Sequence, residues 1–188
     1  MQTSMYRNIG RNMIEMRNPL PGTCAFTGHR PFKFPWRYDE TDSRCLALKA
    51  ALTRQISALA EEGVTDFFSG MAEGTDCYCA QIVLGLRDKN PALRLHCVLP
   101  CREQADRWSA AARARYRSIL GRADSVVYVS PVYYQGCMLA RNRRLVESAA
   151  ILLAVYNGEL RGGTAATVRY AQRLGRRLIV LDPDGLFL

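Results

Sequence analysis

The stretch AILLAVY, residues 150–156, contains no charged residue and runs directly into a glycine-containing loop, NGELRGG, at residues 157–163. A short and nearly continuous apolar run of this kind is typical of a strand that is buried on both faces. Such strands occur in parallel sheets, because helices cover both sides of a parallel sheet. The stretch therefore predicts an α/β protein with one strand of a central sheet at residues 150–156.

Similar apolar runs recur along the chain and alternate with segments of helical character. Further strands are predicted at residues 23–27, 65–69, 93–99, 125–130 and 177–181. Helices are predicted at residues 41–62, 74–89, 103–121, 136–149 and 164–174. Strict alternation of strand and helix is typical of the doubly wound α/β class. We therefore expect a doubly wound, mostly parallel sheet with helices on both faces.

The segment between the first two predicted strands has the clearest helical pattern. Leu48, Leu52, Ile56 and Leu59 fall on one face at helical spacing, and Gly63 stands where it can end the helix. The chain of 188 residues shows no internal repeat, low-complexity tract or linker. We expect a single domain over residues 23–188 and an N-terminal tail over residues 1–22.

The composition is that of an ordinary globular protein, with 48% hydrophobic and 23% charged residues. No run of about 18 apolar residues exists, and the N-terminal segment lacks the apolar region of a signal peptide. The seven cysteines are odd in number and scattered through apolar segments, which indicates buried thiols of a cytoplasmic protein. Their spacing matches no zinc site, so no metal is expected.

The formal net charge is +9, and almost all of the positive charge comes from arginine. Clustered basic side chains bind nucleic acids by releasing counterions from the phosphates. Much of this charge lies on predicted helix surfaces, for example at Arg113, Arg115 and Arg117, where a solvated basic face is the simpler explanation. Nucleic-acid binding stays open as an alternative function.

Unusual residues follow three of the predicted strands, where ligands of open α/β sheets bind. The first loop reads TGHRPFKFP, residues 27–35. Gly28 allows close backbone approach, and Arg30 offers a planar fork for a phosphate or carboxylate. His29 titrates near neutral pH and could act as a general acid. The alternative is that these residues only turn the chain and fix the loop.

The second loop reads SGMAEGTDCYCA, residues 69–80, and leads into a helix. Gly70 and Gly74 would let an anion approach the backbone N–H groups at the start of that helix. Asp76 in the first turn favours contacts to hydroxyls or ribose over phosphate, and it would cap the helix if the site were empty. The pattern is not GxGxxG and does not follow the first strand, so an ordinary NAD-dependent dehydrogenase is disfavoured.

The third loop, NGELRGG, opens the last predicted helix with Gly162, Gly163 and Thr164. Free N–H groups and a hydroxyl would again face outward at a helix N-terminus, although a turn needed only for its geometry is the alternative. Two glycine-rich helix starts at strand ends predict a cleft that recognises phosphate from two sides.

The preceding helix and the loop before it supply further candidates. Arg141 and Arg144 share a helix face at a spacing of three residues and could point toward an anionic ligand. Tyr133 and Tyr134 could stack on a purine base, although buried packing tyrosines are an equally good explanation.

The motifs TGHRP, SGMAEGTD, ARNRRLVESA and NGELRGGTAATVRYA, in this order, resemble the YpsA-like branch of the SLOG superfamily over about residues 23–181. The superfamily also includes the LOG phosphoribohydrolases and DNA-processing protein A. The resemblance implies a Rossmann-like fold that binds a nucleotide or nucleotide derivative, such as an ADP-ribose or NAD-type molecule, in the cytoplasm and often as a homodimer. The expected ligand-binding residues are Thr27, Gly28, His29, Arg30, Ser69, Gly70, Met71, Ala72, Gly74, Thr75, Asp76, Tyr133, Arg141, Asn142, Asn157, Gly162, Gly163 and Thr164.

The chain departs from the LOG pattern PGGxGTxxE at the catalytic glutamate. Thr167 stands at that position, and a threonine cannot stabilise an oxocarbenium-like centre as a carboxylate does. A LOG-type reaction would need Asp76 or Glu73 as the carboxylate, with His29 as a general acid. The leading expectation is therefore a nucleotide-binding sensor. The alternatives are a hydrolase of N-glycosidic or phosphoester bonds and a protein that binds single-stranded DNA.

Overall fold

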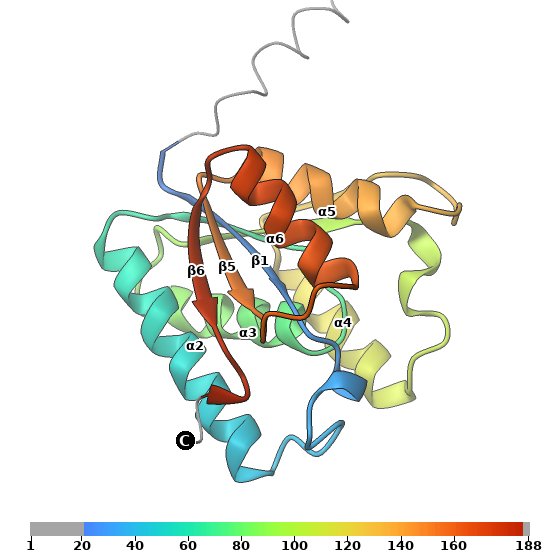
Figure 1. The fold of residues 1–188 in the computed structure, drawn as a ribbon, viewed down its shortest axis with the longest axis horizontal. Coiled ribbons are helices and arrows are strands. Elements are labelled where there is room, and N and C mark those ends of the chain that lie inside the picture. The colour runs from blue at the N-terminus through green and yellow to red at the C-terminus, as the bar shows by residue number, and fades with distance from the viewer. Residues whose placement is uncertain (1–20, 186–188) are drawn as a thin grey trace, which may run out of the picture.

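The computed structural model describes residues 21–185, which form a six-stranded sheet (Figure 1). Helices connect successive strands along the chain. The strands are β1 (Thr23–Gly28), β2 (Asp66–Ser69), β3 (Arg94–Leu99), β4 (Ser125–Tyr128), β5 (Ile151–Val155) and β6 (Arg177–Leu181). The α-helices are α2 (Ser43–Glu61), α3 (Thr75–Arg87), α4 (Ala110–Arg122), α5 (Cys137–Ser148) and α6 (Gly163–Arg173). Two short 3-10 helices, η2 (Pro31–Lys33) and η3 (Arg102–Ala105), complete the described elements. The tail predicted over residues 1–22 lies outside the described residues, apart from Pro21 and Gly22.

The strand order is β4-β3-β2-β1-β5-β6, and every pair of neighbours is parallel. The predicted α/β fold is confirmed, and the sheet is parallel throughout rather than mostly parallel. From β1 the chain adds β2, β3 and β4 on one side, and then it returns to add β5 and β6 on the other. The order therefore reverses between β1 and β5, which is where a ligand site is expected in this class of fold.

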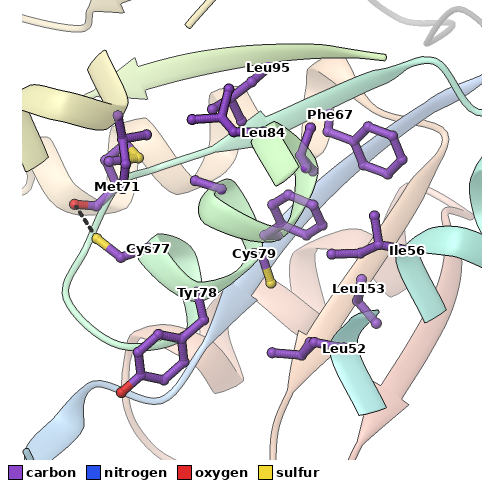
Figure 2. Packing of buried hydrophobic residues seen from close by; sticks show 14 of the residues in the cluster. Leu52, Ile56, Phe67, Met71, Cys77, Tyr78, Cys79, Leu84, Leu95 and Leu153 are labelled. Carbon is purple, nitrogen blue, oxygen red and sulfur yellow. Dashed lines mark hydrogen bonds between the residues drawn. The ribbon is translucent and has the colours of Figure 1, made fainter. Parts of the chain in front are cut away.

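The two faces of the sheet carry separate hydrophobic clusters. One cluster combines Phe26 and Phe67 of the sheet with residues of α2, α3 and α4. Figure 2 shows part of this cluster, with Phe67 of the sheet, Ile56 of α2 and Leu84 of α3. The other cluster joins Ala25 and Leu152 to α5 and α6. Neighbouring residues of β1 thus point into opposite clusters, as the alternation of side chains along a strand requires. The central strands β1 and β5 are buried on both faces for this reason, whereas the edge strands β4 and β6 are partly exposed.

One predicted helix is wrong in its extent. Residues 103–121 do not form one helix but the 3-10 helix η3, a break, and then α4. The Ser109 side chain accepts a hydrogen bond from the N–H of Ala112, 3.2 Å away, and so caps a new helix start. Trp108 packs edge-on against Tyr116 with ring centroids 5.2 Å apart. Gly63, by contrast, follows the end of α2 with a φ of +92°, as predicted.

All seven cysteines are buried and unpaired, which confirms that they are buried thiols. Burial raises the pKa of the Cys24 thiol to about 12. Within residues 21–185 no cluster of three or more histidine, cysteine or acidic side chains has the arrangement of a metal site. None of the described helices has the length and apolar character needed to cross a bilayer.

Candidate functional site

A cavity of about 170 Å³ lies at the carboxyl ends of β1 and β5, where the strand order reverses. Its walls come from the loop after β1, the middle of the loop before α3, the first turn of α3, the first turns of α5, and the loop that leads into α6 together with the first residues of that helix. The lining residues are Thr27, Gly28, His29, Arg30, Phe32, Lys33, Ala72, Asp76, Met138, Arg141, Asn142, Tyr156, Glu159, Arg161, Gly162, Gly163, Thr164 and Ala165. We call this space the switch-point cavity.

The start of α6 forms an open wall of this cavity. Gly162 precedes the helix with a φ of +107°, a conformation that strongly favours glycine. A side chain at Gly162 would meet only the Lys33 amino group at 3.7 Å, and one at Gly163 only the Asn142 amide at 3.9 Å. No described protein group accepts a hydrogen bond from the first N–H groups of α6. An anion can therefore approach this helix N-terminus closely.

The side chains around the α6 start are mainly cationic. Arg30, Lys33, Arg141 and Arg161 line the cavity, against the carboxylates of Asp76 and Glu159. Lys33 donates a hydrogen bond to Glu159, and this bond lowers the pKa of the Glu159 carboxyl. Both members of this ion pair are partly exposed, so the pair is weak and an incoming phosphate can compete with Glu159 for Lys33.

At the start of α3, in contrast, the protein itself accepts from the first N–H group. The N–H and the hydroxyl of Thr75 both donate to the carbonyl oxygen of His29, at 3.3 and 3.1 Å. A side chain on Gly74 would come within 2.8 Å of the same oxygen. The glycines of this loop therefore let two protein segments meet, and the carbonyl oxygen of His29 stands where an anion was predicted at the first N–H group of α3. Asp76 does not cap α3 either, since its carboxylate accepts from the N–H of Ala72 outside the helix.

Arg141 and Asp76 form a buried ion pair in the cavity wall. Their side chains are only 4% and 7% exposed, and the Arg141 Nη1 lies 3.4 Å from the Asp76 Oδ2. The same nitrogen donates to the carbonyl oxygen of Gly70, where a side chain would lie 1.7 Å from it. Burial raises the pKa of Asp76, and the guanidinium of Arg141 opposes this rise. Gly70 thus makes room for an arginine rather than for a ligand.

His29 is almost fully buried, and its orientation is fixed from one side. Its Nε2 lies 3.1 Å from the Oδ1 of Asn157, whose Nδ2 donates to Asp184 at 3.0 Å. Because the Asn157 amide nitrogen is engaged by Asp184, its oxygen faces the ring and Nε2 carries the proton. The Nδ1 atom is then an acceptor, and it has no partner among the described residues. Burial lowers the pKa of His29, so the ring is neutral at pH 7.

This burial predicts a pH dependence of stability. The unfolded chain takes up the histidine proton near the ordinary pKa of about 6.5, whereas the folded protein takes it up only at lower pH. The free energy of unfolding should therefore fall as the pH drops below about 6.5. Urea denaturation of the wild type and of His29→Gln across this range measures the effect. In the variant, the free energy of unfolding should change less steeply with pH than in the wild type. Identical pH dependences would contradict the attribution of this effect to His29.

The structure brings many of the predicted site residues together and leaves others apart. Those that line the switch-point cavity are Thr27, Gly28, His29, Arg30, Ala72, Asp76, Arg141, Asn142, Gly162, Gly163 and Thr164. Ser69, Gly70, Met71, Gly74, Thr75 and Asn157 lie behind this layer and hold it in place through hydrogen bonds and close packing. Tyr133 and Tyr134 are 63% and 44% exposed and do not line the cavity.

Sequence reasoning missed several lining residues. These are Phe32, Lys33, Met138, Tyr156, Glu159, Arg161 and Ala165. Lys33, Glu159 and Arg161 stand in the two loops that the sequence had already singled out, so their charge next to the glycines was the available signal.

Thr167, at the position of the LOG glutamate, is buried and does not line the switch-point cavity. Its hydroxyl donates to the carbonyl oxygen of Gly163 at 2.7 Å and accepts from the Asn142 amide at 2.9 Å. Glu73 lines a different cavity. The two carboxylates of the switch-point cavity are therefore Asp76 and Glu159.

Two solved structures share the fold of this chain. The DNA processing protein A of Streptococcus pneumoniae superposes with a TM-score of 0.57 at 17% identity, covering 92% of this chain and 56% of that one. The corresponding protein of Helicobacter pylori, in a structure described for its single-stranded DNA binding mode, gives a TM-score of 0.59 at 19% identity. It covers 89% of this chain and 67% of that one. The chain thus spans about half to two thirds of these proteins, and the likeness shows the fold alone.

Sequence comparison identifies the family. A UPF0398 protein of Bacillus pumilus is 28% identical over 154 residues, which cover 79% of this chain and 80% of that protein. A UPF0398 protein of Halalkalibacterium halodurans is 31% identical over 128 residues, 67% of this chain and 68% of that protein. The family model YpsA, described as the YspA SLOG family, matches residues 24–180. The chain therefore belongs to the YpsA SLOG family.

Proposed function

We propose that this protein binds a phosphorylated, nucleotide-type small molecule in the switch-point cavity and acts as a sensor of it. The observation that carries the proposal is the start of α6, where Gly162 and Gly163 leave open space in front of free N–H groups. Lys33, Arg30 and Arg161 stand around the same space. A helix N-terminus with adjacent cations is a site for phosphate.

The remaining walls suit the part of the ligand next to the phosphate. The Asp76 carboxylate can accept hydrogen bonds from sugar hydroxyls. The cavity is smaller than the roughly 300–1,000 Å³ that enclose a whole drug-sized ligand. It therefore fits a phosphate and its sugar, while the base lies outside it. The exposed Tyr133 and Tyr134 give no support for a base stacked there.

The test is the stabilisation of the folded protein by candidate ligands. Inorganic phosphate, ribose 5-phosphate, AMP, ADP-ribose and NAD are compared by thermal shift, because a ligand at 100 times its Kd stabilises the fold by about 2.7 kcal/mol. Lys33→Ala should weaken binding of the best ligand about tenfold, since a hydrogen bond to a charged group contributes roughly 1.5–3 kcal/mol and Lys33 is partly exposed.

The matched control is Lys89→Ala, which removes an exposed lysine that lies after the C-terminal end of α3 and does not line the cavity. It should leave the affinity unchanged. If none of the phosphorylated compounds stabilises the wild type, or if both lysine variants bind equally well, the proposal fails.

A hydrolase of nucleotide N-glycosidic or phosphoester bonds is a second candidate. The observation that favours it is that Asp76, with its raised pKa, and His29 line the same cavity. A carboxyl with a raised pKa suits general acid catalysis. Release of base or ribose phosphate that disappears in Asp76→Asn would favour this candidate over a sensor.

Binding of single-stranded DNA is a third candidate, favoured by an arginine-rich groove beside the cavity. Arg143, Arg169 and Arg173 line this groove between α5 and α6, and two of the three guanidinium groups lie over the ring of Tyr170. The Helicobacter pylori relative is described as binding single-stranded DNA. An affinity for single-stranded DNA that falls steeply with salt concentration would support this candidate.

We also propose that the protein is cytoplasmic and forms a homodimer. The unpaired cysteines favour the cytoplasm, and the family resemblance favours the homodimer.

A further inference from the structure

A second cavity, of about 190 Å³, lies next to the switch-point cavity but shares no lining residue with it. Its walls are Pro31, Tyr38, Glu40, Glu73, Gly74, Cys77, Tyr78, Trp108, Ser109, Ala111, Ala112 and Arg115. We call it the aromatic cavity. The two cavities are lined by consecutive residues of the same two loops. Arg30 faces the first and Pro31 the second, and Ala72 faces the first and Glu73 the second.

Three rings give the aromatic cavity its character. Tyr78 is buried, Trp108 is half-buried and packs edge-on against Tyr116, and Tyr38 is 64% exposed. The Lys49 amino group lies 4.8 Å from the centre of the Tyr78 ring. Aromatic side chains at such a surface offer stacking partners for a flat heterocycle, worth about 1–3 kcal/mol per base.

Of the two carboxylates that line the aromatic cavity, only Glu40 has hydrogen-bond partners within residues 21–185. Glu40 accepts from Arg115 and, at 2.6 Å, from Lys49, so its charge is compensated within the protein. Glu73 is half-buried and has no hydrogen bond or ion pair with any described residue. Burial raises the pKa of Glu73, while the charges of Arg30 and Arg115 oppose the rise. The Glu73 oxygens are not fully buried, so water reaches this carboxylate and it is free to accept hydrogen bonds from a ligand.

We propose that the aromatic cavity binds the base of the nucleotide-type ligand, with Glu73 accepting hydrogen bonds from N–H groups on the base edge. This rests on the proposed function, since the switch-point cavity would hold the phosphate and sugar of the same molecule, which would cross over the contact of Gly74 with His29 and Pro31 between the two cavities. A carboxylate matches a base that presents two adjacent N–H donors, as guanine does with its ring N–H and its amino group. The expected ligand is therefore a guanine-type nucleotide, and the base stacks against Trp108 and Tyr38.

The experiment follows Trp108 fluorescence during titration with nucleosides, which carry no phosphate. The chain has two tryptophans, so Trp36→Phe leaves Trp108 as the only reporter. Guanosine should quench this signal more strongly than inosine, which lacks the amino group, or adenosine. Glu73→Gln should weaken guanosine binding at least about fivefold, the lower limit for losing a bidentate contact to a base. Glu103→Gln, at an exposed carboxylate outside the cavity, is the matched control and should have no effect.

Several results would overturn the base site. They are an unchanged Trp108 signal with every nucleoside, guanosine binding that Glu73→Gln leaves intact, and quenching by a quaternary amine such as choline in place of nucleosides. A Tyr38→Ala variant, which alters only an exposed ring, should also weaken guanosine binding. Inorganic phosphate and ribose 5-phosphate test the switch-point cavity separately. If guanosine binds but neither phosphate compound does, the proposed function is refuted and the base site stands. If the phosphate compounds bind but guanosine does not, the base site is refuted and the proposed function stands.

Discussion

Arg141→Met is expected to lower the free energy of unfolding by about 3–5 kcal/mol. Arg141 is 3% exposed, and its guanidinium contacts both the carbonyl oxygen of Gly70 and the carboxylate of Asp76. Methionine fills much of the same volume but leaves a buried carboxylate without its cation. The loss should be larger at pH 8 than at pH 5, because burial raises the pKa of Asp76 and protonation removes the uncompensated charge. Urea denaturation at the two pH values measures both effects.

The neighbouring Arg143→Ala serves as the control, because Arg143 is exposed. Its effect should stay within about 0.5 kcal/mol. The double variant Arg141→Met with Asp76→Asn should recover part of the loss, since an amide keeps an acceptor for the N–H of Ala72 without the charge. An Arg141→Met protein that is no less stable than Arg143→Ala would show that the pair is not buried as described.

Gly28→Ala is expected to lower the free energy of unfolding by about 1–3 kcal/mol. An added Cβ would lie 2.4 Å from the hydroxyl oxygen of Thr75 and 2.6 Å from its Cβ and methyl carbon. Thr75 is buried and its hydroxyl donates to the carbonyl oxygen of His29, so it cannot swing away without losing this bond. The end of β1 and the start of α3 would have to separate. Thermal or urea denaturation measures the loss.

Gly85→Ala is a suitable control for Gly28→Ala. Gly85 lies inside α3, and an added Cβ there would have no neighbour within 4 Å. This substitution should raise stability by roughly 1 kcal/mol, because alanine forms helix better than glycine. Combining Gly28→Ala with Thr75→Ala, which removes two of the three clashing atoms, should restore part of the stability. Equal stabilities of the Gly28 and Gly85 variants would contradict the close approach of β1 and α3.

Most of the fold could be predicted because it depends on local patterns. The last strand has the predicted bounds, residues 177–181, and α2 carries the predicted apolar face and ends before Gly63. The break before α4 was missed because helical propensity continues through residues 103–121. There the cap at Ser109 and the packing of Trp108 against Tyr116 decide where the helix begins.

The site was predicted in its position and only partly in its chemistry. The sequence placed the unusual loops at the ends of strands, and the alternation of strands and helices brings those ends to one edge of the sheet. It could not show that two helix starts with similar glycines differ. Glycine has the same conformational freedom in both, and what differs is whether another segment fills the space in front.

The sequence by itself thus determined the α/β class, the family resemblance and the strand-end loops that carry the site, because each of these depends on residue type and spacing along the chain. Only the tertiary structure decided that the first N–H groups of α6 have no acceptor in the described part of the chain while the first N–H of α3 donates to the carbonyl of His29, and that Arg141 pairs with Asp76. It also placed Glu73 in the wall of the aromatic cavity rather than in the switch-point cavity. These properties arise from contacts between segments that are distant in sequence, and the burial that those contacts create sets which charges and N–H groups remain free for a ligand.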